Sequence, residues 1–193
     1  MLHVIGGGGH ASVVIDVARR GGISEFTVWA DDDPARQRFP RETRFRPLRE
    51  LDPSLAVVLG IGDLAQRARL RARYPVQARP IIDPSAVIGG GAHVGNGVVI
   101  FATSVINANA TVEADAIINT GCIVEHDCVV GENAHLSPGV RLAGGVVVGR
   151  GTHVGIGGIV LPGIRIGEGA VVTRDVPDGV TVVGVPAKVL QRR

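Results

Sequence analysis

The sequence is poor in aromatic residues and cysteines. Phe, Trp and Tyr make up 3% of the 193 residues, so the interior must be built almost entirely from aliphatic side chains. The two cysteines, Cys122 and Cys128, exclude a framework of disulfides, and no CxxC pair is present. We interpret both as small core residues.

The chain also lacks long apolar runs and an excess of charge. No run of about 18 apolar residues exists, so no membrane span is expected. The opening, MLHVIGGGGH, has no basic region and no long apolar stretch, which predicts a cytoplasmic protein without a signal peptide. A net charge of +2 argues against a nucleic-acid partner. Arginines cluster at 36–49 and 67–79 among acidic residues; we interpret these clusters as solvated faces, with an anion site as the alternative.

Residues 1–82 alternate apolar runs with segments of helical spacing. Alternation of this kind predicts a parallel sheet, and its length fits one half of a doubly wound, Rossmann-like fold. A helix should follow Gly6–Gly9, and a second should cover 63–73. The expected strands are Leu2–Ile5, Phe26–Ala30 and Ala56–Ile61, and Ile81–Ile82 is expected to end this domain.

From residue 83 to 193 the pattern changes to a strict period of six. Every sixth residue is aliphatic: Ile88, Val94, Ile100, Ile106, Val112, Ile118, Val124, Val130, Leu136, Leu142, Val148, Val154, Val160, Ile166 and Val172. The residue two positions before each is mostly small, and both cysteines fall in that column. This period predicts a parallel β-helix of hexapeptide repeats, in which three hexapeptides form one coil of a prism.

Seven short motifs together resemble one family. They are Ile5–His10, Asp31–Pro34, Ile61–Asp63, Glu125–Cys128, His135–Pro138, Leu142–Gly145 and Gly184–Lys188. In this order they are similar to the sialic acid O-acetyltransferase and UDP-4-amino-sugar N-acetyltransferase family of left-handed β-helix acyltransferases. The left-handedness comes from the resemblance and not from the spacing. Asp63 and Asp83 depart from the residues that many members carry.

The resemblance implies an acetyl-CoA-dependent homotrimer without a metal, in which a neighbouring prism completes the groove that carries His126 and His135. His126 is the implied base, Asp127 supports it, and Asn119 belongs to the same catalytic set. His135 is implied to lie near the thioester. The Rossmann-like half is implied to hold the UDP-sugar.

Chemistry supports the implied base. An imidazole suits proton acceptance near neutral pH, and a carboxylate can fix its tautomer. His126 and Asp127 are sequence neighbours, which would point in opposite directions on a flat strand but could converge at a corner of the β-helix. His153 lies one coil above His135 and is expected to share its face, as an interface residue. His93 is interpreted as incidental.

Stacking by eighteen residues predicts further contacts of acetyl-CoA. Gly144 lies one coil above His126, where a missing side chain would let the thioester carbonyl approach a backbone N–H; a simple corner glycine is the alternative. Ile156 and Arg174 stack above Pro138 as an expected pantetheine track. Lys188 is expected either to meet the adenine nucleotide phosphates or to be a solvated tail residue.

The N-terminal glycines match a nucleotide-binding fingerprint. Gly6-x-Gly8-x-x-Ala11 precedes a predicted helix, so the amides of Gly7, Gly8 and Gly9 suit a pyrophosphate. Asp31 and Asp32 are expected to accept hydrogen bonds from uracil or ribose, or alternatively to form a capping turn. The resemblance places Gly62 in the same substrate site.

Three alternatives to N-acetylation of a UDP-linked amino sugar remain at this stage. The nearest is O-acetylation of a sugar of the sialic acid type. A β-helix zinc carbonic anhydrase would need three convergent histidines, for which His126, His135 and His153 are available. A nucleotide-sugar sensor would use the N-terminal half without catalysis.

Overall fold

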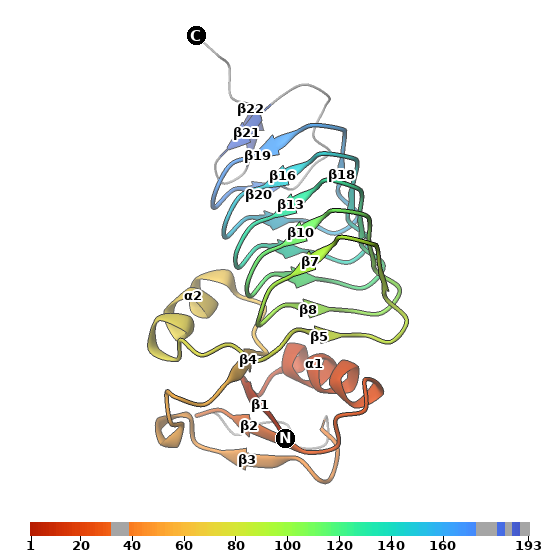
Figure 1. Cartoon of the computed structure of the whole chain (residues 1–193). Helices are drawn as coiled ribbons and strands as arrows, with labels where there is room; N and C mark the ends of the chain where they lie inside the picture. The colour runs from red at the N-terminus through yellow and green to blue at the C-terminus, as the bar shows by residue number, and fades with distance from the viewer. Residues whose placement is uncertain (32–38, 173–180, 184–186, 190–193) are drawn as a thin grey trace.

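Two parts of the chain stack end to end (Figure 1). A computed structural model describes residues 1–31, 39–172, 181–183 and 187–189. The first part is a small α/β domain, and the second is a prism of parallel strands that rises from it. The predicted fold class, a Rossmann-like half-domain followed by a β-helix, is confirmed.

The α/β domain has a four-stranded parallel sheet in the order β3-β2-β1-β4. Its elements are β1 (Leu2–Ile5), α1 (Gly9–Arg20), β2 (Phe26–Trp29), β3 (Arg44–Arg46), a 3₁₀ helix (Leu48–Glu50), β4 (Val57–Leu59) and α2 (Leu64–Arg73). Helix α1 buries Ala11, Val14, Ile15, Val17 and Ala18, which recur at helical spacing. The sequence analysis missed β3, because two exposed arginines flank its single aromatic residue and make an edge strand look like a charged loop.

The prism has three faces, each a sheet of parallel strands, apart from the last strand of the third face, which is antiparallel. The first face contains β5 (Ile81–Ile82), β8 (Val99–Ile100), β11 (Ile117–Ile118), β14 (His135–Leu136), β17 (His153–Val154) and β20 (Val171–Val172). The second face contains β6 (Val87–Ile88), β9 (Val105–Ile106), β12 (Ile123–Val124), β15 (Arg141–Leu142) and β18 (Ile159–Val160). The third face contains β7 (His93–Val94), β10 (Thr111–Val112), β13 (Val129–Val130), β16 (Val147–Val148), β19 (Arg165–Ile166), β21 (Thr181–Val183) and β22 (Lys188–Val189).

The period of six places one aliphatic residue of each strand inside the prism. Strand β11 pairs with β14 eighteen residues later, so equivalent residues stack in columns. From Ile100 to Val172 the predicted column is buried, and Cys122 and Cys128 are buried in the small column. Ile88 is 38% exposed, because β6 is the edge strand of the second face. Strand β5, expected to end the α/β domain, instead pairs with β8 and begins the first face; the boundary after residue 82 stays a prediction.

Helix α2 docks on the prism through arginines that the sequence analysis assigned to a solvated face. That assignment was wrong for Arg67, which is fully buried, and for Arg71, whose side chain is 12% exposed. The Arg71 guanidinium pairs with both carboxylate oxygens of Asp115, at 2.7 and 2.6 Å. An unpaired carboxylate or guanidinium would be costly at such a buried site, so the contact holds both charges in the interface.

Candidate active site

His126 and Asp127 form a dyad at the corner between the second and third faces. The backbone of Asp127 is left-handed, with φ of 60°, which brings its carboxylate alongside the preceding imidazole. His126 Nδ1 and Asp127 Oδ2 lie 2.7 Å apart, and the two side chains are 61% and 60% exposed. The hydrogen bond to Asp127 raises the pKa of His126 above 6.5 and lowers the pKa of Asp127. The predicted convergence at a corner is therefore present.

Gly144 lies directly over the imidazole of His126. A Cβ atom at Gly144 would come within 2.6 Å of His126 Nε2 and 2.7 Å of its Cε1. The next residue, Gly145, donates its N–H to the carbonyl of His126 at 3.0 Å. The structure thus explains why residue 144 is a glycine: any side chain there would collide with the ring of His126. The approach of a thioester carbonyl to the backbone of Gly144 stays a prediction.

His135 belongs to a second cluster, on the first face. Its ring stacks on that of His153 at 5.1 Å, so the two histidines share a face as predicted. Asn119 Nδ2 lies 3.3 Å from His135 Nε2, which puts the asparagine beside His135. Ser137 Oγ lies 2.8 Å from His153 Nε2. Burial, then the neighbouring imidazoles and Arg67, lower the pKa of His135 to about 3, so its ring is neutral at pH 7.

His10 completes this cluster, and the sequence analysis assigned it no role. It lies in the first turn of α1, edge-on to Phe101 at 5.6 Å and 6.3 Å from the ring of His135. Burial, with a contribution from Arg67, lowers the pKa of His10 to about 4. Its Nε2 is buried without a hydrogen-bond partner among the described residues. The available signal was a polar residue directly after the glycines at a helix start.

The glycine loop and the carboxyl ends of β1 and β4 line a cavity of about 400 Å³. The cavity brings together Gly7, Gly8, Gly9, Asp31 and Gly62, as predicted for the substrate site, and Asp32 lies outside the described residues. A Cβ added at Gly8 would meet nothing within 4 Å, so the loop is open toward the cavity. Asp31 Oδ1 accepts the N–H of Leu48 at 3.0 Å, which fixes the carboxylate at the rim.

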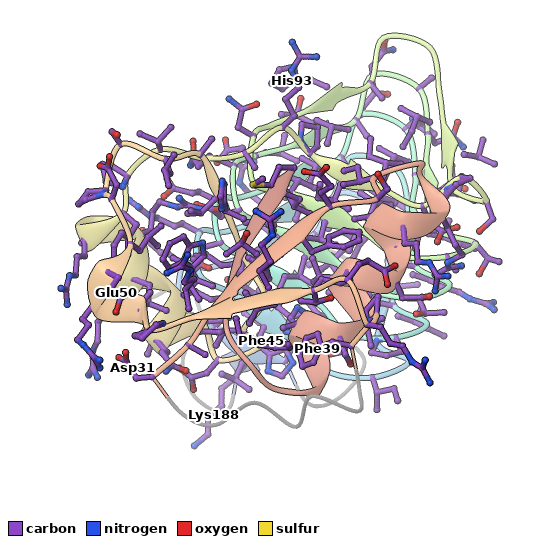
Figure 2. The ribbon with its side chains drawn as sticks, turned by 90° about the horizontal axis from the view of Figure 1, so that it is seen from below. Asp31, Phe39, Phe45, Glu50, His93 and Lys188 are labelled. Atoms are coloured by element: carbon purple, nitrogen blue, oxygen red, sulfur yellow. The ribbon has the colours of Figure 1, made fainter. Side chains whose placement is uncertain are left out.

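The other predicted acetyl-CoA contacts are spread out. Ile156 is 79% exposed at the corner between the first and second faces, whereas Gly144 lies at the corner of the second and third. Arg174 lies outside the described residues. Lys188 is exposed, and His93 lies on the opposite side of the molecule from Asp31 (Figure 2). A groove of about 790 Å³ runs between α2 and the corner of the third and first faces.

One chain does not bring His126 and His135 together. His126 lies at the corner opposite the first face, which carries His135. His135 instead adjoins the glycine-lined cavity, because its ring lies near enough to the backbone of Gly62, a residue of that cavity, for Gly62 to affect its pKa. The expectation of one groove carrying both histidines is therefore not met within a single prism.

Neither a metal-binding cluster nor a membrane-spanning helix is found in the described residues. In these parts of the chain no cluster of three or more His, Cys, Asp or Glu side chains is suited to hold a metal ion. Among the same residues no helix has the length and apolar character to cross a bilayer.

Two family models match the sequence. The PglD N-terminal domain matches residues 1–74, and the bacterial transferase hexapeptide model, of six repeats, matches residues 109–144. No curated protein sequence gives a significant match.

Solved structures match nearly the whole chain. The acetyltransferase domain of PglB from Neisseria gonorrhoeae FA1090, in complex with acetyl coenzyme A, is 29% identical, with a TM-score of 0.79 and 98% of each chain covered. PerB from Caulobacter crescentus, in complex with CoA and GDP-perosamine, is 36% identical over 98% of this chain and 97% of that one, with a TM-score of 0.73. WeeI from Acinetobacter baumannii AYE, at 24% identity and a TM-score of 0.72, shares the fold.

A nucleotide-type cavity joined to a hexapeptide prism with a histidine–carboxylate dyad defines a sugar acetyltransferase of the left-handed β-helix class. The chain belongs to the family of sialic acid O-acetyltransferases and UDP-4-amino-sugar N-acetyltransferases that its motifs resemble. The predicted enzyme class and its co-substrate, acetyl-CoA, are confirmed by these relatives.

Proposed function

We propose that this protein transfers an acetyl group from acetyl-CoA to the amino group of a nucleotide-linked amino sugar, with His126 as general base. The observation that carries the proposal is the His126–Asp127 dyad, which is exposed at a corner, with Nδ1 of the ring 2.7 Å from a carboxylate oxygen and Nε2 facing Gly144, which has no side chain. Such a base needs a substrate brought to it, and the glycine-lined cavity suits a nucleotide diphosphate.

The proposed reaction uses the two ring nitrogens differently. Nδ1–H donates to Asp127, so the lone pair of Nε2 is free to accept a proton. The sugar amine attacks the thioester carbonyl carbon, a C–N bond forms, and the C–S bond breaks. Nε2 takes the proton of the attacking amine, and the coenzyme A thiolate leaves and is protonated. The carboxylate of Asp127 stabilises the imidazolium that forms.

We propose a homotrimer in which neighbouring chains share each active site. The dyad and the glycine cavity lie on opposite sides of one prism, so a neighbour's dyad has to approach the first face. Outward positions of the second face are mostly apolar and could serve association: Val87, Val105, Ile123 and Ile159, with the exposed Arg141 between the last two.

Mixing two impaired variants, at a nucleotide-sugar concentration too low to saturate Gly8→Asp, tests this sharing. Chains with His126→Ala and chains with Gly8→Asp should regain activity when refolded together, because some sites then combine an intact dyad with an intact cavity. Light scattering should give the mass of three chains. A monomer with full activity, or no recovery in mixed trimers, would refute the shared site.

The nucleotide carrier has two candidates. The UDP-linked sugar follows from the family resemblance. A GDP-linked sugar is favoured by a specific observation: PerB, solved with GDP-perosamine, is 36% identical over nearly the whole chain. Glycine amides contact a diphosphate rather than a base, so the loop suits both carriers.

The test is a screen of UDP- and GDP-linked 4-amino sugars with acetyl-CoA, in which acetyl transfer is measured as the release of the free thiol of coenzyme A. His126→Ala should lower kcat by about 10²–10⁴, and His93→Ala, at an exposed residue on the opposite side of the molecule from Asp31 (Figure 2), should leave it unchanged. Thiol release with sialic acid, but with no amino sugar, would favour O-acetylation. Nucleotide binding without turnover on any sugar would favour a sensor.

A further inference from the structure

Arg67 is a fully buried cation without a carboxylate partner of its own. Its exposed fraction is 0%, and burial lowers the pKa of its guanidinium to about 10. The nearest carboxylate, that of Asp115, is already held by Arg71 and Gln77. A buried guanidinium is costly unless its N–H groups make hydrogen bonds. The acceptors of those hydrogen bonds therefore show which segments Arg67 connects.

Those acceptors belong to two separate parts of the chain. Nη1 donates to the carbonyls of Leu59, at 2.6 Å, and of Ile61, at 3.1 Å, both in the segment that leaves β4. Nε donates to Asn133 Oδ1 at 2.9 Å, and Nη2 donates to the carbonyl of Asp115, both in turns of the prism. Arg67 therefore fastens the end of β4 to two successive coils.

The fastened segment is a wall of the nucleotide-type cavity. Gly60, Ile61 and Gly62 all line that cavity. The backbone of Gly62 also lies near the ring of His135 on the first face, close enough to affect the pKa of that ring. A shift of this segment would therefore move the cavity relative to the prism and to the histidine cluster.

We infer that Arg67 is a positioning residue, which sets where a bound nucleotide sugar presents its amine by locking the 59–62 segment to the β-helix. This inference rests on the proposed function. A one-ångström error in position is enough to cost about 10²-fold in rate, so a rigid attachment matters more here than the strength of any single bond.

Arg71 provides a matched control. It lies one helical turn from Arg67 in α2 and also crosses to the prism, through Asp115. Its other acceptors are the carbonyls of Tyr74, Val76 and Val57, so it makes none of the contacts with the 59–62 segment. Loss of Arg71 should loosen the interface without releasing the cavity wall.

The experiment compares Arg67→Lys, Arg67→Met and Arg71→Met in the full-length protein. Both Arg67 variants should raise the KM for the nucleotide sugar at least about tenfold and lower kcat, while the KM for acetyl-CoA stays within about twofold. Arg71→Met should lower the melting temperature but keep the wild-type KM. If Arg67→Met does not fold, Arg67→Lys carries the test, because it keeps the charge but cannot reach four acceptors.

A second readout does not depend on turnover. The charged or titratable groups that face His135 are His10, His153 and Arg67, so NMR titration should show a higher pKa for His135 in Arg67→Met than in wild type. Calorimetry with UDP and with GDP should show weaker binding in both Arg67 variants. Wild-type KM and binding in these variants, or an equal KM rise in Arg71→Met, would overturn the inference. Weakened nucleotide binding in a protein that acetylates no amino sugar would refute the proposed function and leave the role of Arg67 standing.

Discussion

Replacing Gly144 by alanine should separate catalysis from stability. The new Cβ would lie 2.6 Å from His126 Nε2, whereas ordinary contacts begin near 3.4 Å. The imidazole therefore has to move by about 1 Å, which breaks the 2.7 Å contact with Asp127. A displacement of that size costs about 10² in rate, and complete loss of the base about 10²–10⁴. We expect kcat to fall by about 10²–10³.

The fold should tolerate the same change. Gly144 is not among the glycines with a positive φ, so an alanine fits its backbone. The ring that must move is 61% exposed and has room to swing into solvent. The free energy of unfolding should change by no more than about 0.5 kcal/mol, as measured by denaturant titration.

Gly145→Ala, at the adjacent residue, is the matched control. Gly145 has a φ of 69°, and a Cβ there would meet nothing within 4 Å. The substitution should therefore cost about 1–2 kcal/mol in backbone strain and leave kcat close to wild type. A wild-type kcat in Gly144→Ala, together with a strongly lowered kcat in His126→Ala, would refute the reasoning, because His126 would then act as the base even when displaced from its observed position.

Three further predictions concern the loop and the histidines. Gly8→Asp should fold, because the site is open and Asp is a good N-cap, yet its charge should raise the KM for the nucleotide sugar while the KM for acetyl-CoA is unchanged; neutral Gly8→Ser is the control. Asp127→Asn should move the acid limb of the kcat–pH profile to lower pH, because a neutral amide replaces the charged carboxylate whose hydrogen bond raises the pKa of His126; an unmoved limb would mean that His126 does not set it. Stability should fall as pH drops from about 6.5 towards 4, since the unfolded chain then binds protons at His10 and His135 that the folded chain excludes; the loss is up to about 1.4 kcal/mol per pH unit for each histidine, and wild-type stability at pH 5 equal to that at pH 7 would contradict it.

The prism was predictable because its core obeys one local rule. An aliphatic residue at every sixth position, from Ile100 to Val172, is both the signal in the sequence and the buried column in the structure. The dyad came from the family resemblance, and the sequence added only that the two side chains could converge at a corner; the left-handed backbone of Asp127 is how they do so.

Contacts between the two parts of the chain were not predictable in this way. Arg67 lies in a segment whose composition is that of a solvated helix, and it is buried only because α2 docks on Asp115 and Asn133. The separation of His126 and His135 was also missed. It follows from the face of the prism on which each residue lies, and the sequence analysis did not assign residues to the three faces. His10 was missed because its partners, Phe101 and His135, lie far away in the chain.

The location of the dyad on a turn also bears on how the enzyme can change through mutation. Neither His126 nor Asp127 contributes a side chain to the aliphatic column, and both are largely exposed. Substitutions at His126, or at the equivalent position of other coils, draw little on the stability of the prism, whereas the left-handed backbone of Asp127 limits what can replace it. Natural proteins generally lie just above the stability that function requires, so this arrangement widens the set of active-site variants that still fold. A β-helix of this kind can therefore come to acetylate new acceptor substrates while its architecture stays the same.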